Sequence, residues 1–137
     1  MNNIERSELV IAKVLSLLME WGISERELQF SELALDEEEF GRFFFPCIEW
    51  LLSESIIRVE KVDRYAMPET DFGGSVTNPT LTSYGFMLLG QRVALDDETR
   101  EEALSDRVKM VSEGTVDYTK VGNFFGGLLG SFTKSLG

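Results

Sequence analysis

The feature that most constrains the fold is a change in the spacing of apolar residues near residue 55. Up to residue 53, apolar side chains recur every three or four positions, which is typical of helices that pack on a core. In the segment 56–62, apolar and β-branched residues instead alternate with charged ones, which is typical of a strand. The chain must therefore combine helices with a small sheet, and we expect a mostly helical α+β fold.

The first helix is expected over 4–21, where the apolar stripe is wide enough to place the helix at the centre of the core. Gly22 is a typical residue for ending such a helix. The capping-box spacing of residues 24–27 then predicts a short second helix over about 25–34.

A third helix is expected over 37–53, because Asp36 can cap it, Glu39 can return the bond, and acidic residues favour the first turn of a helix. Pro46 lies within this segment, and a proline in a helix interior costs roughly 3 kcal/mol. We therefore expect this helix to be kinked or divided at Pro46.

Turn-forming residues dominate the chain after the first strand, and a second short strand is expected near 72–77 or 79–82. Thr82 is expected to cap a helix that ends at about Val93. A second acidic run predicts one more capped helix over 97–113. The apolar residues that these two helices should turn inward are Phe86, Leu88, Leu89, Ala103, Leu104, Val108 and Val111.

The composition excludes several kinds of chemistry. The 137 residues include no histidine and one cysteine, so the chain has no histidine-dependent catalytic unit, no histidine metal site and no intrachain disulfide. The acidic runs lie at expected helix starts, where capping explains them, and Cys47 lies on an apolar helix face as a small hydrophobic residue would. We therefore expect no enzymatic activity, no cofactor and no metal.

The charge and the chain ends bear on partners and location. The formal net charge of −11 makes phosphate binding unfavourable. The N-terminal residues are polar and of mixed charge, unlike a signal peptide, and no stretch is apolar enough for a membrane span. Together with the single cysteine, these features predict a cytoplasmic location.

Two short sequence phrases resemble parts of the winged-helix (winged helix-turn-helix) superfamily. Residues 48–57 resemble the end of the recognition helix and its exit into the wing, although Ser55 stands where the family often has glycine. Residues 81–89 resemble the leucine-threonine-x-x-glycine start of the helix that follows the wing in many small bacterial and phage proteins. In this phrase Thr82 would cap the helix and Gly85 would let it pack closely on the sheet.

The resemblance implies a winged-helix-like unit with a small β-wing over residues 1–95. Two C-terminal helices are expected to follow it, an acidic-capped helix over 96–114 and a Gly/Phe-rich amphipathic helix over 115–137. Because the third helix of a winged-helix protein enters the DNA major groove and the wing contacts the backbone, the resemblance implies a DNA-binding transcriptional regulator.

The distribution of charge argues against that function. The segment 36–53, which corresponds to the groove-binding helix, carries five acidic residues and one base, a net charge of −4. Such a helix repels phosphates, and acidic neighbours offset the bases of the expected wing strand. The residues that could contact nucleic acid are Arg42, Arg58, Lys61 and Arg64.

The C-terminal segment 117–136 has the most distinctive local pattern. Its glycines lie four residues apart beside an apolar face, and each glycine costs about 1 kcal/mol in a helix relative to alanine, so another surface must stabilise it. The helix could complete the core of its own domain, associate with a partner or a second copy through small-residue packing, or lie on a membrane surface. The candidate interaction residues are Val121, Gly122, Phe124, Phe125, Gly126, Leu128, Leu129, Gly130, Phe132 and Leu136.

These observations favour a non-enzymatic protein-interaction or regulatory module that associates with itself, or with a protein partner, through the C-terminal helix. The alternative is a winged-helix DNA-binding regulator, which the charge disfavours. An acidic mimic of nucleic acid and a membrane-surface protein are weaker alternatives, because acidic surfaces are common and anionic lipid would repel this chain.

Overall fold

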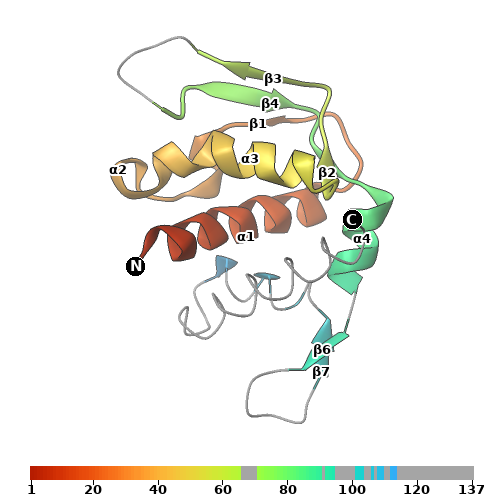
Figure 1. Ribbon diagram of the computed structural model, residues 1–137. Coiled ribbons are helices and arrows are strands. Elements are labelled where there is room, and N and C mark those ends of the chain that lie inside the picture. Colours follow the sequence, from red (N-terminus) through yellow and green to blue (C-terminus); the bar gives the residue numbers. More distant parts are fainter. Residues whose placement is uncertain are drawn as a thin grey trace.

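Helix α1 (Asn3–Trp21) forms the centre of an α+β fold, in which the helices pack beside a small antiparallel sheet (Figure 1). The computed structural model describes residues 1–65, 71–90, 92–94, 101–103, 106, 108–109 and 112–113. Asn2 caps α1 by accepting a hydrogen bond from the Glu5 amide at 2.8 Å. Gly22 ends it with φ 67°, and its amide donates to the Leu18 carbonyl. The predicted first helix is confirmed.

The predicted second helix over 25–34 is wrong in its first half. Residues Glu27–Leu28 form strand β1, and a 3-10 helix, η1 (Phe30–Leu33), follows. Ser24 does not cap a forward helix, because its hydroxyl donates back to the Trp21 carbonyl at 3.0 Å. Pairing of β1 with a distant strand buries Leu28 completely, so tertiary contact overrides the local capping signal.

The predicted third helix is divided, but not at Pro46. The structure has helix α2 (Glu37–Phe40), the 3-10 helix η2 (Gly41–Phe43) and helix α3 (Phe44–Ser53). Pro46 lies in the first turn of α3, where its missing amide hydrogen has no helical acceptor to lose. Asp36 caps α2 through the Glu39 amide at 2.9 Å, as predicted, whereas the Glu39 side chain pairs with Arg6.

Helix α3 ends in a tight turn that Ser55 makes in a left-handed conformation, with φ 60°. The Ser55 amide donates to the Leu52 carbonyl, and the Ile56 amide donates to the Leu51 carbonyl, both at 3.0 Å. This pair of bonds is the Schellman arrangement that usually has glycine at the turn. The turn therefore forms without the glycine that the family resemblance favours.

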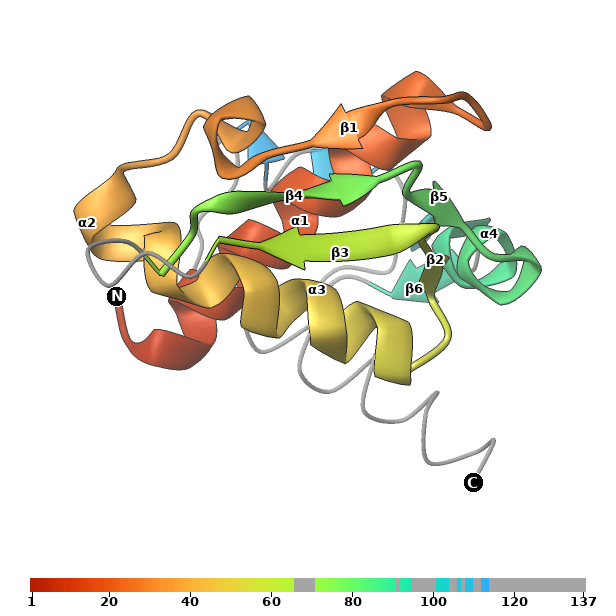
Figure 2. The same ribbon diagram turned by 90° about the horizontal axis from the view of Figure 1, so that it is seen from above.

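Four strands lie between α3 and the next helix: β2 (Ile57–Arg58), β3 (Lys61–Arg64), β4 (Gly74–Thr77) and β5 (Thr80–Leu81). The first sheet has the order β1-β4-β3, and all of its pairs are antiparallel (Figure 2). Strand β2 pairs separately with β5. The single strand predicted over 56–62 is thus interrupted at Val59 and Glu60, and both positions proposed for a second strand are occupied.

Helix α4 (Ser83–Gly90) begins as predicted, with the Thr82 hydroxyl accepting a hydrogen bond from the Gly85 amide at 2.9 Å. It ends before the predicted Val93, which lies in strand β6 (Arg92–Ala94). Strand β6 pairs with β7 (Glu101–Ala103), so the helix predicted over 97–113 is wrong at these residues, including Ala103. A helix does include residues 106, 108–109 and 112. Leu104 and Val111 lie outside the described residues.

The core joins α1, η1, α3, the sheet and α4 in one cluster. Leu88, Leu89 and Val108 are buried as predicted, whereas Phe86 points away from the core and is 48% exposed. No helix among the described residues is long and apolar enough to cross a membrane. The fully buried large side chains are Phe44, Phe45, Leu15, Leu18, Leu28, Leu33, Ile48, Leu51, Ile56, Ile57 and Leu88.

Candidate interaction surface

The exposed residues of the segment 36–53 form one surface over α2, η2 and α3, and we call it the α2–α3 surface. It presents a run of acidic side chains in α2 and a single base, Arg42, in η2. Its exposed residues are Asp36, Glu37, Glu38, Glu39, Arg42, Pro46, Glu49 and Ser53. Five of these side chains are acidic and one is basic, so the surface is acidic on balance.

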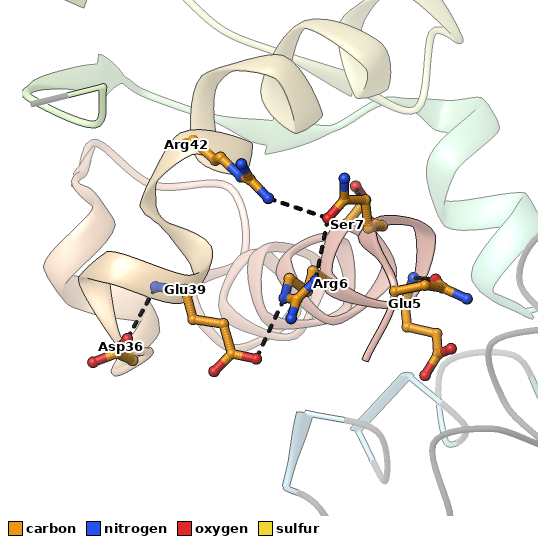
Figure 3. A network of polar contacts seen from close by, with 8 residues as sticks. Glu5, Arg6, Ser7, Asp36, Glu39 and Arg42 are labelled. Carbon is orange, nitrogen blue, oxygen red and sulfur yellow. Dashed lines mark hydrogen bonds and ion pairs between the residues drawn. The ribbon is translucent and has the colours of Figure 1, made fainter.

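Arg42 is held by contacts within the molecule (Figure 3). Its Nη2 donates to Asn3 Oδ1 at 3.2 Å. Its guanidinium also lies 4.8 Å from the centre of the Phe43 ring. Arg6 donates to the same Asn3 oxygen and also pairs with Glu39 at 3.4 Å. These contacts fasten α2 and η2 to the first turn of α1, so Arg42 already has partners.

The other three predicted nucleic-acid contacts also have partners. Arg58 donates to the Thr80 hydroxyl at 3.2 Å. Lys61 Nζ lies 3.3 Å from Asp63 Oδ2. Arg64 lies 3.9 Å from a Glu49 carboxylate oxygen of α3 and 4.8 Å from the centre of the Phe45 ring.

The structure does not bring the four bases together. Arg42 precedes α3 and Arg58 follows it, so the length of a ten-residue helix, about 15 Å, separates them. Lys61 and Arg64 share strand β3, where each is matched by a carboxylate. This arrangement lacks the continuous basic stripe that phosphate binding requires.

Phe72 fastens the loop end of the β3–β4 hairpin to the 3-10 helices, a contact that the sequence did not predict. Its ring centre lies 5.1 Å from that of Phe30. A side chain at Gly41 would collide with the Phe72 ring. An aromatic residue among turn-forming residues is a weak signal, because the same residue could equally be exposed at a loop tip.

Cys47 is buried, as predicted, and only 5% exposed. Its Sγ donates to the Ser7 carbonyl at 3.5 Å. Burial raises the pKa of the thiol from 9.0 to about 12, which outweighs the lowering by the contact with Ser7. At neutral pH the sulfur is therefore a thiol packed in the core, and not an available nucleophile.

Glu8 is a buried acidic residue in the middle of α1 that the sequence reading missed. It is 6% exposed, and its Oε2 has no hydrogen-bond partner within the described part of the chain. Burial, with a smaller contribution from the negative charge of Glu5, raises its pKa from 4.5 to about 7. The only sequence signal was its position among the apolar residues of α1, where it reads as the polar edge of the stripe.

No cluster of potential metal ligands occurs in the portion that the structure describes. The candidate residues of the C-terminal segment, Val121 to Leu136, lie outside the described residues, as does the acidic run at 96–98. Comparison of the chain with protein-family models, with curated proteins and with solved structures found no match.

Proposed function

We propose that this chain is a non-enzymatic protein-interaction module of winged-helix-like arrangement, which associates with a second copy of itself through the segment 121–136. The proposal joins three lines of support: the local structure of the two winged-helix phrases, the charge of the α2–α3 surface, and the apolar pattern of the C-terminal segment.

The winged-helix part of the proposal is supported by the two phrases that carry the resemblance. Ser55 makes the tight exit from α3 into the strand, and Thr82 caps α4. The backbone of Gly85 packs directly against the carbonyl of Ile56, as the resemblance implies. The β3–β4 hairpin follows α3 as a wing would.

The single observation that carries the choice of protein over DNA is the state of the α2–α3 surface. Its exposed carboxylates repel phosphate, and its one base is engaged with Asn3 and Phe43. Protein surfaces tolerate such a pattern, because opposite charges on a partner steer association and determine its register.

Self-association is supported by the sequence of the C-terminal segment. Its apolar face carries three phenylalanines, and the glycines beside it allow two backbones to approach closely. This segment carries a net charge of only +1, from Lys134, in a chain of net charge −11, so electrostatic repulsion between two copies is small there.

Sedimentation velocity tests this part of the proposal on the full chain. We expect Phe125→Asp to reduce dimer formation, because it places a charge on the apolar face, whereas Asn123→Asp, off that face, should leave it unchanged. A chain truncated after Gly114 should associate much more weakly than the full chain. If the full chain and the truncated chain are both monomers, self-association is wrong.

The two phrases also favour a second candidate, a DNA-binding regulator that uses the wing. Electrophoretic titration with duplex DNA at low salt tests it. We expect no shift at micromolar protein. A shift that Lys61→Ala and Arg64→Ala both weaken would establish the regulator in place of the interaction module.

A further inference from the structure

Strand β3 is an open edge of the three-stranded sheet. In the order β1-β4-β3 it is outermost, and within the described residues it pairs with β4 alone (Figure 2). The Tyr65 amide donates to the Gly73 carbonyl at 2.9 Å, so the backbone groups of Tyr65 point towards β4. Because these directions alternate along a strand, the amide and carbonyl groups of Val62 and Arg64 point away from the sheet.

The side chains along this edge alternate in charge. The order is Glu60, Lys61, Val62, Asp63 and Arg64, and all of the charged residues except the half-buried Asp63 are exposed. Charged residues usually protect an edge strand from pairing with another strand. That protection fails when the order of signs is complementary to itself.

We propose that β3 is the edge at which a second copy of this chain pairs, antiparallel, about a two-fold axis at Val62. In that register Lys61 lies opposite Asp63 of the second copy. This contact occurs twice by symmetry, so two pairs of opposite charge flank two facing valines. The pairing joins the two sheets into one.

The same charges disfavour several other registers. Centring the pair between Val62 and Asp63 sets Lys61 opposite Arg64 of the second copy. Centring the pair on Lys61 places Lys61 opposite Lys61 of the second copy, and centring it on Asp63 places Asp63 opposite Asp63 of the second copy. A parallel in-register pair does the same along the whole strand. Like charges directly opposite are unfavourable, so the charges favour the register centred on Val62 over these.

The central pair carries most of the argument. Lys61 and Asp63 contact each other at 3.3 Å within one strand, and their side chains are 64% and 48% exposed, so both can reach a neighbouring strand. Glu60 accepts a hydrogen bond from Asn78, and Arg64 lies near Glu49, so these two are shared with partners in their own copy. An edge of this length buries little surface, so we expect weak, concentration-dependent pairing.

A charge-reversal experiment on the full chain tests this pairing, which does not depend on the C-terminal segment. Lys61→Glu alone places two carboxylates opposite each other, and Asp63→Lys alone does the same with two ammonium groups. We expect each single variant to associate about tenfold more weakly than the unmodified chain. The double variant Lys61→Glu/Asp63→Lys restores opposite charges and should associate as the unmodified chain does.

Mixing the two single variants gives the sharper result. The Lys61→Glu chain and the Asp63→Lys chain repel their own copies but are complementary to each other, so an equimolar mixture should form a heterodimer at low salt. Circular dichroism of each variant verifies that it is folded. Sedimentation velocity that shows no gain on mixing, or association unaffected by any of these variants, would overturn the edge pairing. Association that Phe125→Asp abolishes and that none of the β3 variants changes would overturn it too, while leaving the proposed function intact.

Discussion

Ser55 holds a backbone conformation that suits glycine better than serine. Its φ of 60° lies in the left-handed region, where a Cβ atom costs roughly 1 kcal/mol. We expect Ser55→Gly to raise the free energy of unfolding by about 0.5–1 kcal/mol, because the turn and its two amide bonds are kept and the strain is removed. Urea denaturation followed by circular dichroism measures the change.

The matched control is Ser53→Gly, two residues earlier in the same helix. Ser53 is helical, so glycine there should lower the stability by up to about 1 kcal/mol. If both glycines shift the stability in the same direction, the left-handed strain at Ser55 does not explain its effect.

Glu8 couples the stability of the fold to pH. Its pKa rises from 4.5 in an ordinary environment to about 7 when the chain folds, so the folded state binds the proton more tightly. Its contribution to stability is therefore complete below about pH 4.5 and is lost as the pH rises through about 7. We expect the unmodified chain to lose on the order of 1–3 kcal/mol of its free energy of unfolding over this pH range. In Glu8→Gln this loss should disappear.

Urea titrations at several pH values between about 4.5 and 8 measure this slope for the unmodified chain and for Glu8→Gln. Glu20→Gln, an exposed residue of the same helix, should leave the slope unchanged. An unaltered slope in Glu8→Gln would show that the buried carboxylate is not its source.

At the scale of elements, the sequence predicts best where a segment's own pattern decides its structure. The stripe of α1, the Asp36 cap and the Thr82 cap are local features, and all three form as predicted. The segment 25–34 fails because β1 is stabilised by Val76 and Thr77, about 50 residues away, and no local signal reports that pairing.

The same distinction explains the division of the third helix. Pro46 is the obvious breaker in the sequence, yet its place in the first turn of α3 makes it harmless. The division instead falls at Gly41, which is buried beneath Phe72 of the hairpin. A contact between residues 31 positions apart is not visible in the helical pattern.

The site was predicted in part. The acidic character of the α2–α3 surface follows from composition along one helix, and the burial of Cys47 follows from its apolar neighbours. The partners of Arg42 and Arg64 come from α1 and α3 respectively, and only the folded chain brings them together. The open edge of β3 is likewise visible only in the folded chain, because it depends on the order of the strands in the sheet.

The packing of α4 on the sheet depends on one glycine. A side chain at Gly85 would meet the carbonyl oxygen of Ile56. We expect Gly85→Ala to lower the free energy of unfolding by about 1–3 kcal/mol, because the helix must shift away from the strand. Gly90→Ala, in the same helix with no heavy atom within 4 Å of the added carbon, should be neutral or slightly stabilising. Equal effects of the two substitutions in thermal denaturation would contradict this close packing.

At the scale of the whole molecule, the net charge of −11 has a specific placement. Acidic residues cover the α2–α3 surface, while Arg6, Arg42 and Arg64 contact carboxylates or polar and aromatic neighbours. Repulsion between copies is reduced at two places, the C-terminal segment and the alternating edge of β3. The distribution of charge thus favours association with protein over binding to nucleic acid.

Sedimentation velocity of the full chain, alone over a concentration series and then with labelled duplex DNA at low salt, tests the central claim that this chain acts by associating with protein. We expect a concentration-dependent shift from monomer to dimer, and DNA that sediments as it does alone. A chain that remains monomeric throughout the series and carries the DNA with it would contradict the claim.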